Sequence, residues 1–345
     1  MFKRALLHIG FEKTGSTSVQ VFLTDNIARL RALGYFVPRS LVREDGFCNH
    51  TRLVAYALAD HKLDDDLRLH HGVTNAAQLA AFRETTTANL AEEAAAATGC
   101  GFMLLSNEHL SSRVTEAAEL ANLQALLATV CEQVTIFVYL RNQADLLQSA
   151  YNEAIKVGFH NIDLIPDFAN KATGGWVERR YFEYGSTLAL WAETFGQENI
   201  MVRLFEPDGL LFGDVVQDLL FRIHVDPSRF TAFPRANEGL DASAQHFLKQ
   251  LNGSLAHLAA NDAARIRERV IDILMQERRG TGRKLTASDA AAFVAQFEDE
   301  NESVRRRWFP DRPTLFRTRD DIAAEVDPPC DDSFRIMTLL LEALL

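Results

Sequence analysis

The stretch that decides the fold runs from Leu6 to Gln20 and reads LLHIGFEKTGSTSVQ. It begins with bulky apolar residues, as a buried strand does, and ends in residues that open an apolar repeat at helical spacing. Between the two, Gly10 and Gly15 bound a loop in which backbone N–H groups can approach an anion closely. The helix that follows points its unpaired N–H groups into this loop. The stretch therefore predicts a cradle for a phosphate or sulfate group.

The side chains of the loop suit the same ligand. Lys13 supplies a positive charge, and Thr14, Ser16 and Thr17 supply hydroxyl groups. In a Walker A loop the lysine follows the second glycine, whereas here Lys13 stands two residues before Gly15. This arrangement resembles the 5′-phosphosulfate loop of sulfotransferases that use 3′-phosphoadenosine 5′-phosphosulfate (PAPS). The resemblance is to the form found in carbohydrate and bacterial polysaccharide sulfotransferases, and it implies PAPS as the co-substrate.

Apolar runs alternate with helical repeats through the first two thirds of the chain. The expected strands are 6–9, 35–38, 102–105, 135–140 and 200–205, and the expected helices are 16–33, 50–59, 75–98, 119–130, 143–157, 184–195 and 214–224. Such alternation indicates an α/β fold with a central parallel sheet of about five strands between two helix layers. We therefore predict a three-layer, P-loop-like fold.

The last third of the chain carries helical repeats only, in residues 241–260, 262–277 and 288–297. We expect a single domain over 1–345, in which 1–235 form the α/β core and 236–345 a helical C-terminal part. Residues 39–99 match the sulfotransferase pattern least and are expected to form a variable, acceptor-binding region. The basic run 278–284 is expected to be a solvated loop between helices.

Composition narrows the class of function. The chain has 345 residues, 47% of them hydrophobic, with a mean hydropathy of −0.09 and a net charge of −11. A net negative charge argues against general nucleic-acid binding. No run of about 20 apolar residues is present, so we expect no membrane span and a cytoplasmic location. Four separated cysteines, Cys48, Cys100, Cys131 and Cys330, favour reduced thiols over a metal site or disulfide framework.

A second motif extends the resemblance. Sulfotransferases of this family bind the 3′-phosphate of PAPS with an arginine at a strand end and a serine eight residues later. Arg141 follows the 135–140 strand, and Ser149 stands eight residues further on. Arginine suits a phosphate because its guanidinium offers forked donors. Arg235 falls where the family places a loop over the same phosphate, but the lysine and glycine of better-known members are absent here. Whether Arg235 contacts the 3′-phosphate is therefore left open.

Weaker matches continue to the end of the chain. The segment 184–191 with Phe195 and Gly196 resembles the family's segment before the fifth strand. Residues 301–303, 306–310 and 315–316 resemble its usual ending.

The base that would accept the acceptor's proton is sought after the 102–105 strand, where the family places a glutamate or histidine. Glu108 and His109 both stand there, and we choose Glu108, with His109 kept as the alternative. His50 is a more remote possibility, and His8, within the first strand, is expected to be a core histidine. No metal is expected, because no aspartate of the Walker B type ends the third or fourth strand.

The resulting hypothesis is sulfuryl transfer from PAPS to a hydroxyl group of a carbohydrate, as a glycan or polysaccharide precursor, or of another small acceptor. Lys13 and Glu108 or His109 would be catalytic, while Lys13, Thr14, Gly15, Ser16, Thr17, Arg141 and Ser149 would bind the nucleotide. Two alternatives remain: a P-loop nucleotide kinase, and a non-catalytic relative that binds 3′-phosphoadenosine 5′-phosphate (PAP) as an interaction module. The sequence does not fix the acceptor or the oligomeric state.

Overall fold

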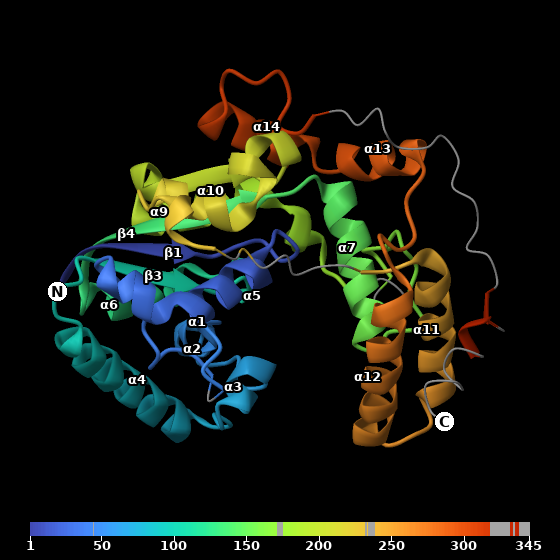
Figure 1. The fold of residues 1–345 in the computed structure, drawn as a ribbon, viewed down its shortest axis with the longest axis horizontal. Helices are drawn as coiled ribbons and strands as arrows, with labels where there is room; N and C mark the ends of the chain where they lie inside the picture. The colour runs from blue at the N-terminus through green and yellow to red at the C-terminus, as the bar shows by residue number, and fades with distance from the viewer. Residues whose placement is uncertain are drawn as a thin grey trace. The chain divides into compact units, whose positions relative to one another are not determined.

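A computed structural model describes residues 1–43, 45–170, 175–231, 233, 239–317, 332–333 and 335–337. The chain groups into two compact units (Figure 1). The first comprises Met1–Arg141, Tyr184–Ala236 and Ser303–Pro310, and the second comprises Asn142–Glu183, Asn237–Glu302 and Asp311–Leu345.

The first unit is built on a five-stranded sheet. Its strands are β1 (Phe2–His8), β2 (Tyr35–Phe36), β3 (Phe102–Ser106), β4 (Cys131–Leu140) and β5 (Ile200–Leu204). They are all parallel and lie in the order β2-β3-β1-β4-β5. In this register Leu7 lies beside Leu105 on one side and Ile136 on the other, and all three are buried. The predicted α/β class with five parallel strands is confirmed.

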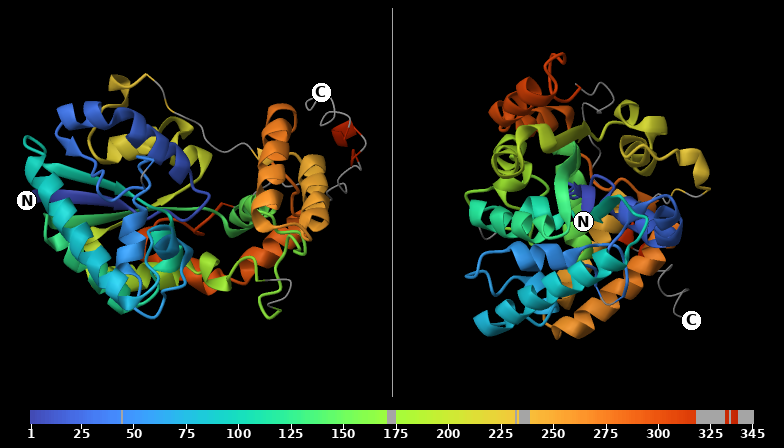
Figure 2. Two further views of the ribbon diagram at one scale, coloured as in Figure 1. Left: turned by 90° about the horizontal axis from the view of Figure 1, so that it is seen from below. Right: turned by 90° about the vertical axis from the view of Figure 1, so that its left-hand side faces the viewer.

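Helices cover both faces of this sheet, as the end-on view in Figure 2 shows. One layer contains α1 (Ser16–Ala32) and α10 (Val215–Arg222), which share a core with Leu6, Phe137 and Tyr139 of the sheet. The other layer contains α6 (Ala117–Ala128) and α9 (Tyr184–Phe195). Coverage on both faces explains why the strands are nearly continuous apolar runs.

The strand boundaries differ from the prediction at the amino ends. β1 begins at Phe2 and β4 at Cys131, four residues earlier than expected in each case. The added residues include exposed polar side chains, which hide the strand from a hydropathy pattern. They are nevertheless paired, since Phe2 lies opposite Cys131 and Arg4 opposite Gln133. Strand pairing here depends on the backbone ladder, which is indifferent to side-chain polarity at a sheet end.

The strand order places one crevice where ligands bind in open parallel sheets. The chain leaves β1 through α1 toward β2 on one side, and β4 lies on the other side of β1. Such a reversal opens a crevice at the carboxyl ends of the two strands. The loop after β1 and Arg141 after β4 both stand at this edge.

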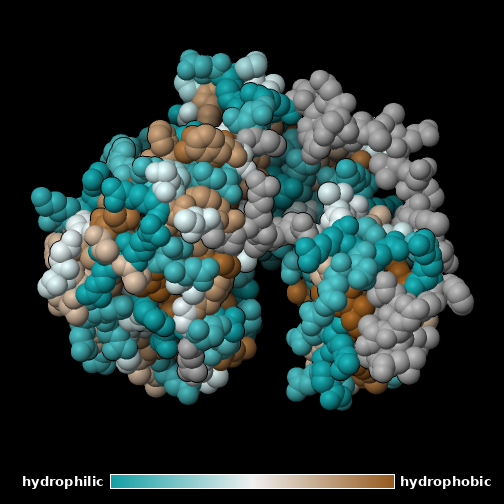
Figure 3. All heavy atoms as spheres, in the orientation of Figure 1, coloured by the Kyte–Doolittle hydropathy of each residue, from teal (hydrophilic) through white to brown (hydrophobic). Residues whose placement is uncertain are grey.

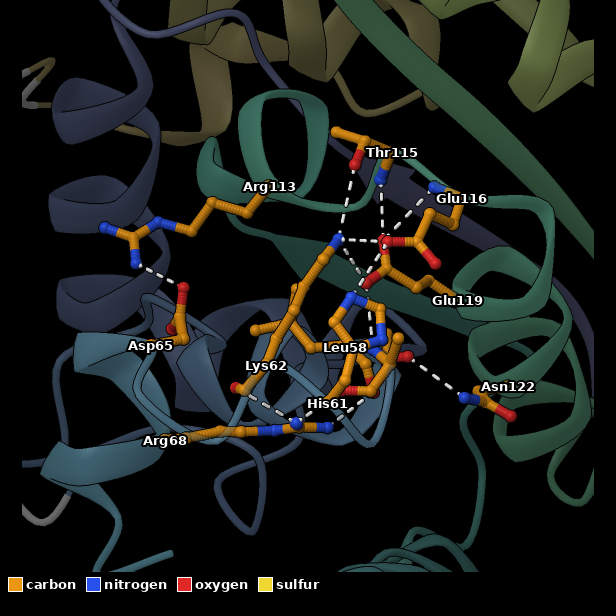
Figure 4. A network of polar contacts seen from close by, with 12 residues as sticks. Leu58, His61, Lys62, Asp65, Arg68, Arg113, Thr115, Glu116, Glu119 and Asn122 are labelled. Atoms are coloured by element: carbon orange, nitrogen blue, oxygen red, sulfur yellow. Dashed lines mark hydrogen bonds and ion pairs between the residues drawn. The ribbon is translucent and has the colours of Figure 1, made fainter. Parts of the chain in front are cut away.

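Residues 39–99 contain the short helices α2 (Thr51–Ala57) and α3 (Asp66–His70) and the long helix α4 (Ala76–Ala96). Buried charges hold this region together (Figure 4). Arg68 is fully buried and donates to the carbonyl oxygens of Ala55, Leu58, Ala59 and Lys62. One guanidinium thus binds backbone carbonyls at and after the end of α2, where a helix leaves carbonyls without partners inside the helix.

A buried carboxylate completes the network. Glu119 of α6 is fully buried, and its Oε1 lies 2.6 Å from Lys62 Nζ and accepts from the Ala59 N–H at 2.8 Å. Its other oxygen accepts from the Thr115 and Glu116 N–H groups. The charge is therefore both paired and hydrogen-bonded, the condition under which a buried carboxylate is tolerated.

Replacing Arg68 by alanine should destabilise the first unit. The change removes the guanidinium from four carbonyl oxygens, of which those of Leu58 and Ala59 keep a second donor. It also opens a cavity, so we expect a loss of about 3 kcal/mol or more in the free energy of unfolding. Urea unfolding followed by circular dichroism measures it. Arg43→Ala is the matched control, because Arg43 forms only an exposed pair with Asp45 and should cost less than about 1 kcal/mol. Equal losses for the two variants would contradict this account of Arg68.

The second unit contains α7 (Gln143–Lys156), α11 (Ala242–Leu255), α12 (Ala260–Glu277) and α13 (Ala287–Ala295). Helix α14 (Glu298–Trp308) has residues in both units. The second unit contains an aromatic cluster of Phe168, Phe182, Phe293 and Phe297. Only Ala263 and Leu274 of α12 are buried, and the hydrophilic colouring of this helix in Figure 3 agrees.

The basic run 278–284 is more ordered than predicted. Residues Arg279–Gly280 form β7, which pairs antiparallel with β6 (Gly239–Leu240). Arg278 forms ion pairs with Asp241 at 2.7 Å and with Asp332 at 3.0 Å. The run is therefore anchored by the ion pairs of Arg278 and by strand pairing. The prediction of a solvated loop, which rested on composition, did not include these contacts. None of the described helices is long and apolar enough to cross a membrane.

Candidate active site

The loop between β1 and α1 is held in an unusual backbone conformation. Gly10, Lys13 and Gly15 have φ angles of 50°, 65° and 86°. This left-handed region suits glycine, but it costs an ordinary residue such as lysine free energy. A strained residue in a loop at a sheet's carboxyl edge is typical of functional sites.

The surroundings of Gly15 explain why the loop requires a glycine there. A Cβ added at Gly15 would lie 2.9 Å from Val215 Cγ1 and 3.3 Å from the Phe205 ring. Val215 opens α10 and Phe205 follows β5, so both elements press directly on the loop. Close packing of these two side chains therefore leaves no room for a Cβ at this position.

The start of α1 is available to an anion. Gly15 occupies the N-cap position, no side chain caps the helix, and no acidic residue stands in its first turn. The first N–H groups of the helix and its dipole therefore favour a negative ligand. Ser16 Oγ is buried and has no hydrogen-bond partner among the described residues. A buried hydroxyl in this position is well placed to bind an oxygen atom of a phosphate or sulfate.

The two threonines of the loop differ. The Thr14 hydroxyl is fully buried and donates to the Phe11 carbonyl, so it fastens the loop to itself. Thr17 is exposed at the first turn of α1, where its hydroxyl faces solvent.

Arg141 joins the end of β4 to the loop. Its Nη1 donates to the Lys13 carbonyl at 2.9 Å, and its guanidinium lies 5.7 Å from the centroid of the Phe205 ring. Tyr184 donates from its hydroxyl to the Arg141 carbonyl at 2.6 Å, and its ring meets Phe11 edge-on. The structure thus places the Arg141 side chain against the backbone of the loop.

Glu108 reaches the same loop from β3. A Cβ added at Gly10 would lie 2.9 Å from Ser16 Oγ and 3.1 Å from Glu108 Cβ. The absence of a side chain at Gly10 therefore lets the end of β3, the loop and the start of α1 approach one another. Gln20 of α1, itself buried, donates from Nε2 to Glu108 Oε2. This bond fixes the direction of the carboxylate.

His109 is bound differently from its neighbour. Its Nδ1 lies 3.1 Å from Glu12 Oε1, and Ser112 Oγ donates to the same oxygen at 3.0 Å. Burial lowers the pKa of His109, but the hydrogen bond that it donates to Glu12 and the charges of Glu12 and Glu108 outweigh this effect, so the pKa lies above its usual value. A histidine that holds its proton in this way is a poorer base at neutral pH than a free one.

The raised pKa of His109 makes a prediction for Glu12→Gln. A histidine whose pKa is raised by folding stabilises the folded state below its unfolded pKa of about 6.5, and this contribution is lost as the pH rises through the raised value. The free energy of unfolding of the wild type should exceed that of the variant by up to about 1 kcal/mol near pH 6, and the two values should be equal near pH 9. Urea unfolding at both pH values measures the difference.

The control for this experiment is Glu84→Gln, which removes an exposed carboxylate of α4. It should show no comparable pH dependence. A difference between wild type and Glu12→Gln that stays constant from pH 6 to pH 9 would show that Glu12 does not act through the His109 charge.

The other two histidines considered in the sequence analysis, His8 and His50, are structural. His8 is buried with Nδ1 2.9 Å from Ser106 Oγ, and burial lowers its pKa to about 4. It is a core histidine, as predicted. His50 is fully buried, accepts at Nδ1 from the Ser106 N–H and donates from Nε2 to the Pro38 carbonyl. Its pKa is likewise about 4, with burial as the main cause. His50 therefore ties β3 to the end of β2 and is not a base at the loop.

Ser149, a predicted nucleotide-binding residue, and Arg235, whose contact with the 3′-phosphate was left open, do not belong to the described part of the first unit. Ser149 lies on α7 in the second unit, and its role remains a prediction. Arg235 lies outside the described residues. Asn301, from the predicted ending, is buried and accepts from Gln143 Nε2 at 2.6 Å within the second unit.

Sequence reasoning missed Gln20 and Glu12. Gln20 stands four residues after Ser16, and this spacing places both on one face of α1. A polar residue on that face, beside the anion loop, was the available signal. Glu12 gave no such signal, since an acidic residue inside an anion-binding loop looks unfavourable until His109 is placed next to it.

Comparisons with known proteins add the following. No protein-family model matches the chain. An uncharacterized protein of Archaeoglobus fulgidus is 26% identical over 201 residues, which are 54% of this chain and 49% of that protein. The match thus spans about half the length of this relative. The crystal structure of a sulfotransferase from Alicyclobacillus acidocaldarius is similar over 89% of this chain and 96% of its own, with a TM-score of 0.46 and 10% identity. No activity follows from a likeness of this degree.

Within the described residues, no group of three or more histidine, cysteine, aspartate or glutamate side chains is arranged to hold a metal ion. Cys48, Cys100 and Cys131 are free thiols, while Cys330 lies outside the described residues.

Proposed function

We propose that the protein is a sulfotransferase that transfers a sulfuryl group from PAPS to a hydroxyl group of a carbohydrate acceptor. The observation that carries the proposal is the meeting of an anion cradle and a carboxylate. A Cβ added at Gly10 would lie within 3.1 Å of both Ser16 Oγ and Glu108 Cβ. A cradle for the donor and a proton acceptor for the nucleophile therefore adjoin each other, as transfer to a hydroxyl requires.

The residues of the loop fit the phosphosulfate end of the donor. Ser16 offers a buried hydroxyl without a partner among the described residues, and the uncapped start of α1 offers N–H groups. Lys13 offers a positive charge. These donors match an anion of tetrahedral oxygens. Arg141, which follows β4, and Ser149 are proposed to bind the 3′-phosphate at the other end of the nucleotide.

The chemistry divides between two side chains of this chain. PAPS supplies an activated sulfuryl group. Glu108 accepts the proton of the acceptor hydroxyl while the new O–S bond forms and the S–O bond to the phosphate of PAPS breaks, leaving PAP. Lys13 stabilises the negative charge that develops on the departing oxygen. Gln20 orients the Glu108 carboxylate for this task, and Glu12 raises the pKa of His109 beside it.

The two competing functions are less well supported. A nucleotide kinase of this fold uses a lysine after the second glycine and an acidic residue that holds Mg²⁺. Here Ser16 takes the lysine's position, β3 ends at Ser106, and Arg141 follows β4. A non-catalytic PAP-binding protein would not need a carboxylate fixed by a buried glutamine beside the cradle.

The donor preference is tested by calorimetric titration with PAP, AMP and ATP, with and without Mg²⁺. PAP should bind more tightly than AMP or ATP, and Mg²⁺ should not be needed. Arg141→Ala should weaken PAP binding by about 1.5–3 kcal/mol, the size of a charge-assisted hydrogen bond, while AMP binding stays nearly unchanged. AMP is the internal control, because Arg141 also holds the Lys13 carbonyl. Equal losses for both nucleotides would assign Arg141 a role in loop structure only, and equal wild-type affinities would refute the PAPS assignment.

The choice of base is tested with Glu108→Gln and His109→Ala. An acceptor is first found by screening saccharides with labelled PAPS, and turnover is then measured with it. Glu108→Gln keeps the shape of the side chain and removes its basicity, so kcat should fall by about 10²–10⁴ while PAP binding is retained. His109→Ala should lose less, since His109 is already paired with Glu12. The opposite ranking would transfer the role of base to His109.

A further inference from the structure

A cavity lies within the second unit, and none of the residues assigned a role above lines it. It has a volume of about 370 Å³ and is lined by residues of α7 and α11, with His160 and Arg283 from outside these helices. Figures 1 and 2 show these two helices side by side. Its volume falls in the range of small-molecule sites.

The charged groups that line this cavity have one sign. Lys249 and Arg283 are cationic, and no aspartate or glutamate is found among the described lining residues. Lys249 Nζ donates to the Ile162 carbonyl at 2.5 Å and lies 5.8 Å from the Tyr151 ring centroid. An ammonium group has three donors, so Lys249 retains donors for a ligand. In a chain of net charge −11, a cavity with two cations and no acid favours an anion.

A buried amide gives independent evidence of a missing partner. Gln245 is only 2% exposed. Its Oε1 accepts from the Arg283 N–H at 2.9 Å, which fixes the direction of the amide. Its Nε2 has no hydrogen-bond partner among the described residues. An unsatisfied buried donor costs free energy, and a ligand oxygen in the cavity would remove that cost.

The remaining lining residues suggest what carries the anionic group. Tyr151, Ile155 and Ala242 form an apolar wall, which suits the C–H face of a ring. His160, His246 and Gln250 add imidazole and amide groups that can bind hydroxyls. We propose that this cavity binds an acidic sugar, a pyranose that carries a carboxylate or a sulfate group. The inference goes beyond the proposed transfer reaction and does not depend on it.

The proposal is tested by NMR titration of the intact protein with glucuronate, glucose 6-sulfate and glucose. Both charged sugars should bind, and glucose should bind at least about tenfold more weakly because it lacks the charge-assisted bonds. Tighter binding of glucuronate would identify a carboxylated sugar as the source, and tighter binding of glucose 6-sulfate a sulfated one. Glucose bound as tightly as glucuronate, or no binding of either charged sugar, would overturn the proposal.

Variants locate the site. Lys249→Met and Arg283→Gln should each raise the dissociation constant of the charged sugars about tenfold or more. Arg269→Gln is the matched control, since Arg269 is an exposed arginine of α12 that does not line the cavity, and it should change binding by less than about twofold. Wild-type binding by both cavity variants would overturn the proposal. PAP titration of the same variants should give the wild-type affinity, which shows an intact fold and separates this test from that of the transferase.

Discussion

The site depends on one constraint, the left-handed backbone of the loop between β1 and α1. Lys13 adopts a φ of 65° between Gly10 and Gly15, a conformation that a lysine adopts only when its surroundings hold it there. Val215 and Phe205 press on Gly15 from behind, and Arg141 holds the Lys13 carbonyl. The cradle is thus maintained by β4, β5 and α10, which the chain adds long after the loop itself.

A layer of polar bonds beneath the loop supports the carboxylate. Ser106, the last residue of β3, contacts His8 through its hydroxyl and His50 through its backbone. Asn107, which is fully buried, donates from its backbone to the His8 carbonyl and from its side chain to Asn49. Since burial keeps both histidines neutral at physiological pH, this layer carries no charge that would compete with Glu108 above it. Such neutral, hydrogen-bonded packing restricts the position of the backbone from which Glu108 extends.

Much of the fold and of the anion cradle could be predicted because their causes are local in sequence. The glycine spacing, the lysine between the glycines and the onset of a helical repeat all lie within Leu6 to Gln20. The alternation of strands and helices predicted the parallel sheet, and its carboxyl edge then placed Glu108 and Arg141 near the loop. Strand ends such as Phe2–Arg4 were missed, since their pairing with β4 depends on the backbone and not on hydropathy.

By itself the sequence determined the class of fold, the glycine-bounded loop after β1 and the carboxyl ends of β3 and β4 near it. The tertiary structure alone decided which polar side chains meet across long separations. Gln20 holds Glu108, and Glu12 raises the pKa of His109, although 88 and 97 residues separate the partners. Arg68 lies buried among backbone carbonyls, and Gln245, which lines a cavity, has a buried amide donor without a partner among the described residues. A hydrogen bond depends on distance and direction in space, and no pattern along the chain encodes either.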